Sequence, residues 1–522
     1  MNSFFLKRLK MLDSPDWLLS LSGIKRGFEK ECLRVNKQGL ISTTPHPKVL
    51  GSSLTHPMIT TDFSEGLLEF ITPPTENLHA PYTVLKALHI YTNQNLKDEL
   101  LWSASMPCTL PKETEIPIAE YGSSNLGRLK HIYRRGLAFR YGRIMQTISG
   151  IHYNFSLSDN FWQKYHTHSG SMLKKQHFIS EQYLGLIRNS LRIGWLLPLL
   201  FGASPAVSTS FFAEHQPDLE VNGSDTYFGP FATSLRLSDL GYHNREQMDD
   251  KILYNTFLTF LETMRKAVHT SVPRYRQIGV FKDGEYNQLS DCVFQIEDEH
   301  YALVRPKRVS GREERMMSAI LRDGIEYIEV RALDINPFVP IGIEQDTVYL
   351  LDAFLIYCLL TDSPLLTDAE NQQIEYNHSQ VVKRGRQPKL SLLDEQGKPR
   401  ELVDWAMELL TSIEAVAVLL DKAYGNQVFT NACQIAKKRV LEPDTLPSAQ
   451  VLKDIKAHGG SYFDFASDWS LKHQQYFRNQ QMGSSELKAY DTLVKDSFLA
   501  QKELENTDIL SFDKYLKLYL AT

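Results

Sequence analysis

The chain has 522 residues, of which 42% are hydrophobic and 23% are charged, and its formal net charge is −5. This composition is typical of a globular protein with one large or two to three ordinary domains, and it argues against a nucleic-acid binder or a basic membrane-surface protein. The longest apolar runs, 194–202 and 348–360, are too short to span a bilayer, the N-terminus lacks the apolar core of a secretion signal, and the five cysteines are scattered, so we expect a reduced, cytoplasmic protein.

The first 72 residues are predicted to contain strands. Residues 28–35 alternate in polarity, and residues 66–72 form a short apolar run that holds one acid, Glu69, before two prolines end it. Side chains two apart in a strand share a face. Glu29 and Glu31 are therefore expected to point in the same direction.

Two helices and a strand with two distinct faces follow. Residues 79–101 and the basic segment 126–141 have helical spacing, and residues 145–157 are predicted to form a strand. From Ile151 onward, the odd positions of this strand are apolar, whereas its even positions carry His152, Asn154 and Ser156. The pattern predicts one apolar and one polar face.

The rest of the chain changes from mixed to helical character. Further helices are expected at 181–197 and 246–269, and strands at 293–296, 302–305 and 325–332, where Glu329 and Arg331 would share a face. Beyond about residue 342 the helical period dominates, with one apolar stripe from Leu402 to Leu420 before a capping Gly425, a helix capped by Ser484, and a loop at 383–400. We predict an α+β protein with a sheet-rich catalytic body, residues 1–365, and a mainly helical region, residues 366–522, packed on it.

Two motif-like segments favour ordinary structure. Gly122-Ser-Ser-Asn-Leu-Gly-Arg128 lacks the Lys and the Ser or Thr with which a P-loop holds phosphate and Mg²⁺, so it is interpreted as a turn leading into a helix. His166-Thr-His168 has a spacing seen in metal sites but lies in a polar stretch, which favours a surface loop.

Several acids and one histidine fall in strand-like, otherwise apolar segments. For any one of them, a structural role is the more common explanation, but a face that gathers several carboxylates is costly unless cations fill it. Oxygen ligands with one imidazole suit Mg²⁺ or Mn²⁺, which usually bridges carboxylates to substrate phosphates. The pattern therefore favours an ATP-using enzyme without a P-loop, with metal ligands at Glu29, Glu31, Asp62, Glu69, His152 and Glu329.

Longer segments resemble glutamate–cysteine ligases of the proteobacterial type. The resemblance is specific from about residue 22 to 345 and weaker beyond. It is carried by Gly27-Phe-Glu-Lys-Glu-Cys-Leu-Arg-Val-Asn36, Ile59-Thr-Thr-Asp-Phe-Ser-Glu-Gly-Leu-Leu-Glu-Phe-Ile-Thr72, Met145-Gln-Thr-Ile-Ser-Gly-Ile-His-Tyr-Asn-Phe-Ser156 and Gly324-Ile-Glu-Tyr-Ile-Glu-Val-Arg331.

The resemblance implies a glutamine synthetase-like fold, in which a curved, largely antiparallel sheet holds the site and helices surround it. It also implies that ATP, L-glutamate and L-cysteine react through γ-glutamyl phosphate in the first step of glutathione synthesis, with two to three Mg²⁺ or Mn²⁺ ions held by the acids and His152. Glu329, Arg134 and Arg331 are expected to be catalytic. Binding roles are expected for glutamate at Arg236 and Arg331, for cysteine at Phe63, Tyr133 and Tyr242, and for the nucleotide at Arg134, Gln146 and Asn154.

Three other functions compete with this interpretation. A ligase could join the γ-carboxyl of glutamate to a different amine, a metal-dependent hydrolase could use the same acids around bound water, and a binding protein could have lost catalysis. Unused buried carboxylates would be a cost without a return, which argues against the last. We expect a monomer whose partners are small-molecule substrates, with neither nucleic acid nor membrane.

Overall fold

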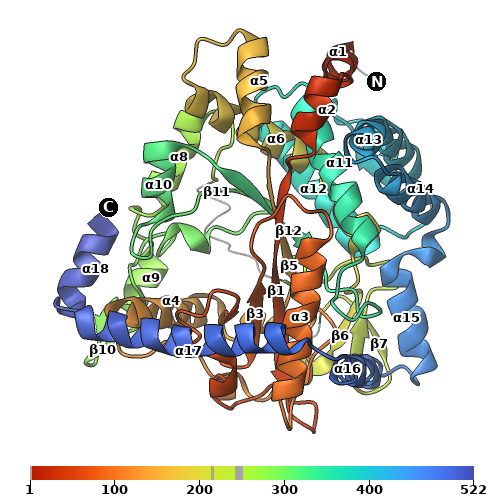
Figure 1. Cartoon of the computed structure of the whole chain (residues 1–522). Coiled ribbons are helices and arrows are strands. Elements are labelled where there is room, and N and C mark those ends of the chain that lie inside the picture. The colour runs from red at the N-terminus through yellow and green to blue at the C-terminus, as the bar shows by residue number, and fades with distance from the viewer. Residues whose placement is uncertain (1–2, 213–216, 242–250, 522) are drawn as a thin grey trace.

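The computed structural model describes residues 3–212, 217–241 and 251–521 (Figure 1). Its central element is a seven-stranded sheet in the order β11-β12-β5-β1-β3-β2, with β4 pairing on β1. Every pairing in this sheet is antiparallel. The strands are β1 (Lys25–Val35), β2 (Ile59–Thr61), β3 (Leu67–Ile71), β4 (Leu100–Leu101), β5 (Ile151–Ser156), β11 (Val304–Lys307) and β12 (Tyr327–Leu333).

Helices surround the sheet and make up most of the chain after residue 345 (Figure 1). The predicted α+β class is confirmed. The helices are α1 (Ser3–Leu12), α2 (Pro15–Leu21), α3 (Ala80–Asn95), α4 (Asn125–Tyr141), α5 (Asp159–Ser169), α6 (Lys175–Ile193), α7 (Leu196–Phe201), α8 (Phe257–Ala267), α9 (Pro273–Ile278), α10 (Met316–Asp323), α11 (Gln345–Leu360), α12 (Asp368–Arg384), α13 (Leu402–Tyr424), α14 (Val428–Leu441), α15 (Pro447–Ala457), α16 (Tyr462–Arg478), α17 (Ser484–Thr507) and α18 (Phe512–Ala521).

Three small sheets complete the fold. They comprise β6 (Ala206–Ser208), β7 (Glu220–Asn222) and β8 (Thr226–Phe228), the pair β9 (Phe281–Lys282) and β10 (Glu285–Tyr286), and the pair β13 (Ser391–Leu393) and β14 (Pro399–Glu401). Within the described residues, no helix combines the length and the apolar composition that crossing a bilayer requires.

The two faces of the central sheet differ as the alternating sequence predicts. Ile151, Tyr153 and Phe155 of β5 and Ile328 and Val330 of β12 are fully buried in the main hydrophobic core, which α3, α6, α11, α13 and α14 cover. This burial fixes the register of each strand, because a slip by one residue would turn the apolar set out of the core. The polar residues between them consequently face the other side. The core includes residues on both sides of the predicted boundary at 365, which stays a prediction.

Several predicted elements differ in extent. Residues 293–296 form no strand, because their backbone N–H groups bond to the end of α8: Val293 donates to the Thr270 carbonyl and Phe294 to that of Ala267. Residues 145–147 form a 3₁₀ turn before β5, in which the Thr147 hydroxyl donates to the Ile144 carbonyl at 2.6 Å. The helix expected at 79–101 ends at Asn95, since Arg478 binds the carbonyls of Asn93 and Leu96.

Later boundaries shift as well. The helix expected at 246–269 begins at Phe257, with residues 246–250 outside the described residues, and the loop expected at 383–400 holds the β13–β14 pair. Gly425 caps α13 in the left-handed conformation, as predicted, whereas Gly483 rather than Ser484 caps α17.

A buried ion pair joins β1 to the helical layer. The Arg26 Nε donates to Asp352 at 2.6 Å, and both side chains are fully buried. Asp352 also accepts a hydrogen bond from the Tyr153 hydroxyl, and Arg26 donates to the Tyr424 hydroxyl at 2.8 Å. These bonds fasten β1 and β5 to α11 and α13. They also explain why an aspartate interrupts the apolar run of α11.

Replacing Asp352 by Leu is expected to lower the free energy of unfolding by about 3–5 kcal/mol, because it leaves the Arg26 guanidinium buried without a counter-charge. Urea unfolding followed by circular dichroism measures this. The double variant Arg26→Met/Asp352→Leu removes both charges and should recover much of the loss. An Asp352→Leu protein as stable as the unaltered chain would show that the pair contributes little.

Candidate active site

The polar face of the central sheet places charged residues of neighbouring strands opposite one another. Glu31 of β1 lies opposite Glu69 of β3, and Glu29 lies opposite His152 of β5. Glu329 of β12 lies between Asn154 of β5 and Arg305 of β11. Five strands thus contribute to one stripe of polar side chains. The stripe forms part of the wall of a cavity of about 580 Å³, a size suited to small-molecule substrates.

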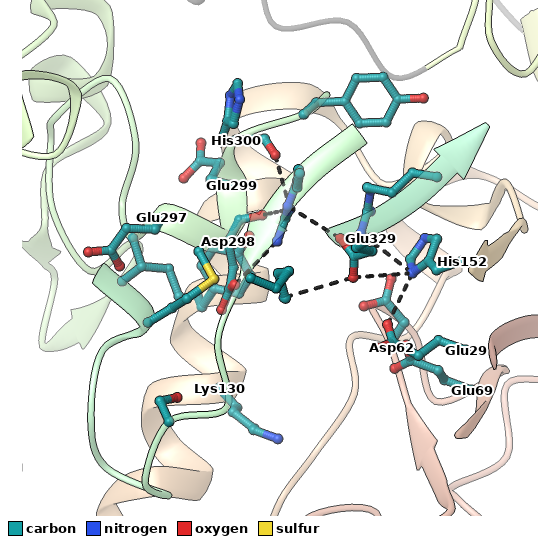
Figure 2. Close-up of a pocket in the computed structure, with 18 of the residues that line it drawn as sticks. Glu29, Asp62, Glu69, Lys130, His152, Glu297, Asp298, Glu299, His300 and Glu329 are labelled. Atoms are coloured by element: carbon teal, nitrogen blue, oxygen red, sulfur yellow. Dashed lines mark hydrogen bonds and ion pairs between the residues drawn. The ribbon is translucent and has the colours of Figure 1, made fainter. Parts of the chain in front are cut away.

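Three of these side chains form the tightest group. Ligand atoms of Glu29, His152 and Glu329 all lie within 4.8 Å of one another, and Figure 2 shows the three side chains converging. The His152 Nδ1 is 3.2 Å from the Glu29 carboxylate and 3.9 Å from that of Glu329, while its Nε2 is 3.8 Å from Glu31. Asp62, in the turn after β2, and Glu69 lie beside this group (Figure 2). The structure therefore brings all six predicted ligands to one cavity.

Cations surround one end of the acidic group. Glu329 lies 3.1 Å from the Arg331 Nη1, 3.3 Å from the Arg305 Nε and 3.8 Å from the Lys307 Nζ. Burial alone would raise the pKa of Glu329, but these three cations hold it well below its usual range. Glu329 therefore stays ionised although its side chain is almost completely buried.

Negative charge is in excess at the other end. Burial, followed by repulsion from Glu29, Asp62 and Glu31, raises the pKa of Glu69 well above its usual value. Burial likewise raises the pKa of Glu31. These carboxylates cannot all ionise without further positive charge. A divalent cation would supply it, and oxygen ligands with a single imidazole fit Mg²⁺ or Mn²⁺, which could be held by Glu29, Glu31, Asp62, Glu69, His152 and Glu329.

Helix α4 brings positive charge to the acidic group from the opposite wall. Arg134 lies with its Nη2 3.8 Å from the Asp62 carboxylate, and its Nη1 donates to the Lys130 carbonyl at 3.0 Å. Its guanidinium carbon lies 4.7 Å from the centre of the Tyr121 ring, which fixes its plane. Lys130 and Tyr133 of the same helix also line the cavity. Burial and the charge of Arg134 lower the pKa of Lys130 to about 8.

Arg236 reaches the cavity through a gap left by a glycine. Its Nη2 donates to the Arg331 carbonyl at 3.0 Å and its Nη1 to the Leu333 carbonyl at 3.2 Å. A Cβ on Gly150 would lie only 2.0 Å from the Arg236 Nη2. The same glycine donates its N–H to Glu31 at 2.7 Å. Gly150 thus allows a buried guanidinium and a buried carboxylate to approach the same turn.

The remaining predicted contact residues occupy different positions. Gln146 lines the cavity, and its buried amide nitrogen has no hydrogen-bond partner among the described residues. Asn154 donates to Glu29 at 2.7 Å and so supports the acidic group from the sheet. Phe63 is buried in a hydrophobic cluster with Leu137, behind the cavity lining, and Tyr242 lies outside the described residues.

A second acidic group was not predicted. Glu297, Asp298 and Glu299 lie across the cavity from His152 (Figure 2). Glu297 is paired with Arg315 at 2.7 Å, and Glu299 with Arg140 at 2.9 Å. The charges of Glu297 and Glu299 are therefore already balanced, which makes these two acids structural supports of the wall. In sequence they resemble a solvated acidic loop, because their arginine partners are distant.

The cations of β11 and of the loop after it were missed for a different reason. The segment Arg305-Pro-Lys-Arg308 lies in the part of the chain that carries the resemblance, yet its spacing predicts no chemistry. Lys307, Arg308 and Arg312 nevertheless line the cavity. His166 and His168, expected in a surface loop, lie in the last turn of α5 and outside the cavity.

Comparisons with known proteins agree over the whole chain. The family model described as glutamate–cysteine ligase matches residues 9–381. The glutamate–cysteine ligase of Azotobacter vinelandii is 44% identical over 525 residues, with 100% of this chain and 99% of that protein covered, and the ligase of Pseudomonas putida strain KT2440 is 45% identical with the same coverage.

Solved structures agree as well. The crystal structure of glutamate–cysteine ligase from Francisella tularensis in complex with AMP superposes with a TM-score of 0.90 at 36% identity, covering 96% of this chain and 98% of that one. A bifunctional glutathione synthetase from Pasteurella multocida, 22% identical, shares the fold alone, with a TM-score of 0.75 over 93% of this chain and 58% of that one.

Mn²⁺ binding should depend on the converging side chains. His152→Ala is expected to weaken Mn²⁺ binding by at least roughly tenfold. Removing a residue that only supports a metal ligand already lowers metal affinity by roughly ten- to a hundredfold, and loss of a ligand should cost no less. Titration followed by electron paramagnetic resonance of free Mn²⁺ measures this. The matched control is Glu76→Gln, an exposed acid beyond β3, which should leave binding unchanged. Equal affinity of the His152→Ala and unaltered proteins would exclude His152 as a ligand.

Proposed function

The chain belongs to the glutamate–cysteine ligase family, and we propose that its acidic cavity is the place where the three substrates of that reaction meet. The enzyme joins the amine of L-cysteine to the γ-carboxyl of L-glutamate and converts ATP to ADP and phosphate, which is the first step of glutathione synthesis. The convergence of carboxylates, one imidazole and a rim of cations in a single cavity is the observation that supports this placement.

ATP is needed because a carboxylate oxygen is a poor leaving group. The γ-carboxylate of glutamate attacks the terminal phosphorus of ATP, ADP leaves, and the γ-glutamyl phosphate that forms has phosphate as its leaving group. The cysteine amine, once deprotonated, attacks the carbonyl carbon and expels that phosphate. Little covalent chemistry is required of the protein, so catalysis rests on positioning and on neutralising charge.

We assign the phosphate contacts to the cations on α4 and on the loop after β11. Arg134 lines the cavity beside Asp62 of the acidic group. A guanidinium in this position can donate two parallel hydrogen bonds to a phosphoryl group. Gln146 has a buried amide nitrogen without a hydrogen-bond partner among the described residues, which would donate to an oxygen of the bound nucleotide, and Asn154 holds Glu29 in place. A nucleotide site is supported by the AMP complex of the Francisella relative.

The six predicted ligands fit Mg²⁺ or Mn²⁺. Bound metal would screen the phosphate charge and polarise the transferred phosphoryl group. Glu329 contributes a carboxylate that its cationic neighbours keep ionised, and it also orients Arg331. Because Glu329 would bind metal and also contacts Arg331, it would couple the position of glutamate to that of the phosphates.

Recognition of the two amino-acid substrates is assigned to arginine and tyrosine side chains that line the cavity. Arg236 and Arg331 are two guanidinium groups on one side of the acidic stripe, joined by the bond from Arg236 to the Arg331 carbonyl, and they would hold the carboxylates of glutamate. Tyr133 lines the cavity and would contact cysteine, with Phe63 supporting that wall from behind. Tyr242 keeps its proposed place in the cysteine pocket on the resemblance alone.

ADP formation should require glutamate and cysteine together. We expect little ADP without either one, because the acyl phosphate forms on glutamate and is discharged by the amine. A coupled assay compares cysteine with alanine, 2-aminobutyrate and ammonia. A higher kcat/KM for one of the other amines would identify a different γ-glutamyl ligase, and turnover without ATP would identify a hydrolase.

Gly150→Ala should impair glutamate binding, since the added Cβ displaces the Arg236 guanidinium. We expect the KM for glutamate to rise by roughly ten- to a hundredfold, because a small displacement of a positioning group can have an effect of this size. The control is Gly185→Ala in α6, where the added carbon has ordinary contacts of 3.5 Å or more. Steady-state kinetics with glutamate as the varied substrate measures both. An unchanged glutamate KM would exclude Arg236 from that role.

A further inference from the structure

The helices at the C-terminal end of the described chain form an arm that ends at the cavity. This C-terminal arm, residues 484–521, consists of α17 and α18. Figure 1 shows α17 running along one end of the molecule toward α4, and α18 standing beyond it near α9 and α10. The arm contributes no strand to the sheet, and most of α17 is exposed. The middle of α17 contacts Tyr91 and residues 52–55, whereas the end of α17 and α18 contact the helix that carries Arg134.

The arm occupies the N-terminus of α4, where the segment resembling a P-loop lies. The Ser123 N–H donates to the Glu505 carboxylate at 3.0 Å, and the Asn125 N–H donates to Asp508. A Cβ on Gly122, whose φ is +79°, would lie 2.2 Å from the Gln501 amide. The N–H groups that a P-loop would offer to phosphate are therefore used by carboxylates of the same chain.

The outer face of α4 is covered by α18. Phe512, Tyr515 and Leu516 are buried against Leu129 and Ile132 of α4. The Arg128 guanidinium carbon lies 4.4 Å from the centre of the Phe512 ring, and the Asn125 side chain donates to the Leu510 carbonyl at 3.0 Å. Both the start and the outer side of α4 are thus held by the arm.

Along α4, three cavity residues recur every fourth position. Leu126, Lys130 and Arg134 line the cavity and share one helix face, because they are separated by about one turn each. Arg134 contacts Asp62 in the acidic group. The α4 wall of the cavity therefore changes from cationic to apolar over the roughly 12 Å of helix between Arg134 and Leu126. A nucleotide with its phosphates at Arg134 would direct its base toward Leu126.

Tyr519 of α18 lies at this apolar end. It lines the cavity together with Leu126, Leu129 and Met316. The neighbouring Leu520 carbonyl accepts a hydrogen bond from Arg315 at 3.2 Å, and Arg315 is the buried partner of Glu297 in the cavity wall. Tyr519 also lies parallel to Tyr515, with ring centroids 6.2 Å apart. The contact with Tyr515 and the hydrogen bond at the neighbouring Leu520 carbonyl therefore fix the position of Tyr519.

We propose that the C-terminal arm completes the active site by placing the Tyr519 ring against the heterocyclic base of the nucleotide. This inference rests on the proposed function. Among the three substrates only ATP has an aromatic ring, so a flat aromatic wall selects for the nucleotide and leaves the two amino acids untouched. Tyr519 is a nucleotide-positioning residue, because its ring lines the cavity beside the apolar residues at the start of α4.

Tyr519→Ala should weaken nucleotide binding selectively. We expect the KM for ATP and the Kd for ADP, measured by isothermal titration calorimetry, to rise by roughly tenfold, within the range for loss of an aromatic ring that stacks on a base. The KM values for glutamate and cysteine should change by less than about twofold. Tyr519→Phe keeps the ring and should bind ADP almost as the unaltered enzyme does.

Leu518→Ala is the matched control, because Leu518 is adjacent in α18 and 59% exposed. It should leave all three KM values and the midpoint of thermal unfolding unchanged. Unaltered ADP binding by Tyr519→Ala, or an equal rise in KM for all three substrates, would overturn the inference while leaving the proposed function intact. Failure of the unaltered enzyme to bind ADP would overturn both.

Discussion

The site depends on gathering like charges on one face of a sheet and balancing them. Period-two alternation places Glu29, Glu31, Glu69 and Glu329 on the same side, where they repel one another in a partly buried cavity. Arg305, Lys307 and Arg331 balance Glu329 within the protein, but the strongly raised pKa of Glu69 shows that the balance is incomplete. The acidic face is therefore a receptor for positive charge, which bound cations would supply.

The apolar face of the same strands provides stability that offsets the repulsion between the acids. The apolar residues that alternate with the polar ones on β5 and β12 are buried against helices, so the strands cannot slip without exposing an apolar row. The Arg26–Asp352 pair adds a directional bond from β1 to α11. Rigidity on the apolar face thus sets the spacing of the charges on the polar face, which is how packing remote from the cavity controls the chemistry.

Much of this site could be predicted from sequence because it lies on strands. Alternation indicated that Glu29 and Glu31 share a face of one strand and that Glu329 and Arg331 share a face of another, and the structure brings Glu29 and Glu329 together with His152. Contacts made by loops could not be predicted, since the arginine partners of Glu297 and Glu299 are distant in sequence and nothing local distinguishes these acids from solvated ones. Likewise, residues 293–296 have the composition of a strand, but bonds to the end of α8 satisfy their backbone.

The helix that carries Arg134 illustrates a further limit of motif reasoning. Its first turn looks like a phosphate-binding loop, yet Glu505 and Asp508 already occupy its N–H groups, so the dipole of α4 is used to fasten the C-terminal arm. Under the proposed function, phosphate would instead be held by side chains, and Lys130 and Arg134 line the cavity on the same helix. Cationic side chains suit a site that would also hold metal, because guanidinium and ammonium groups can contact phosphate from the wall opposite the carboxylates.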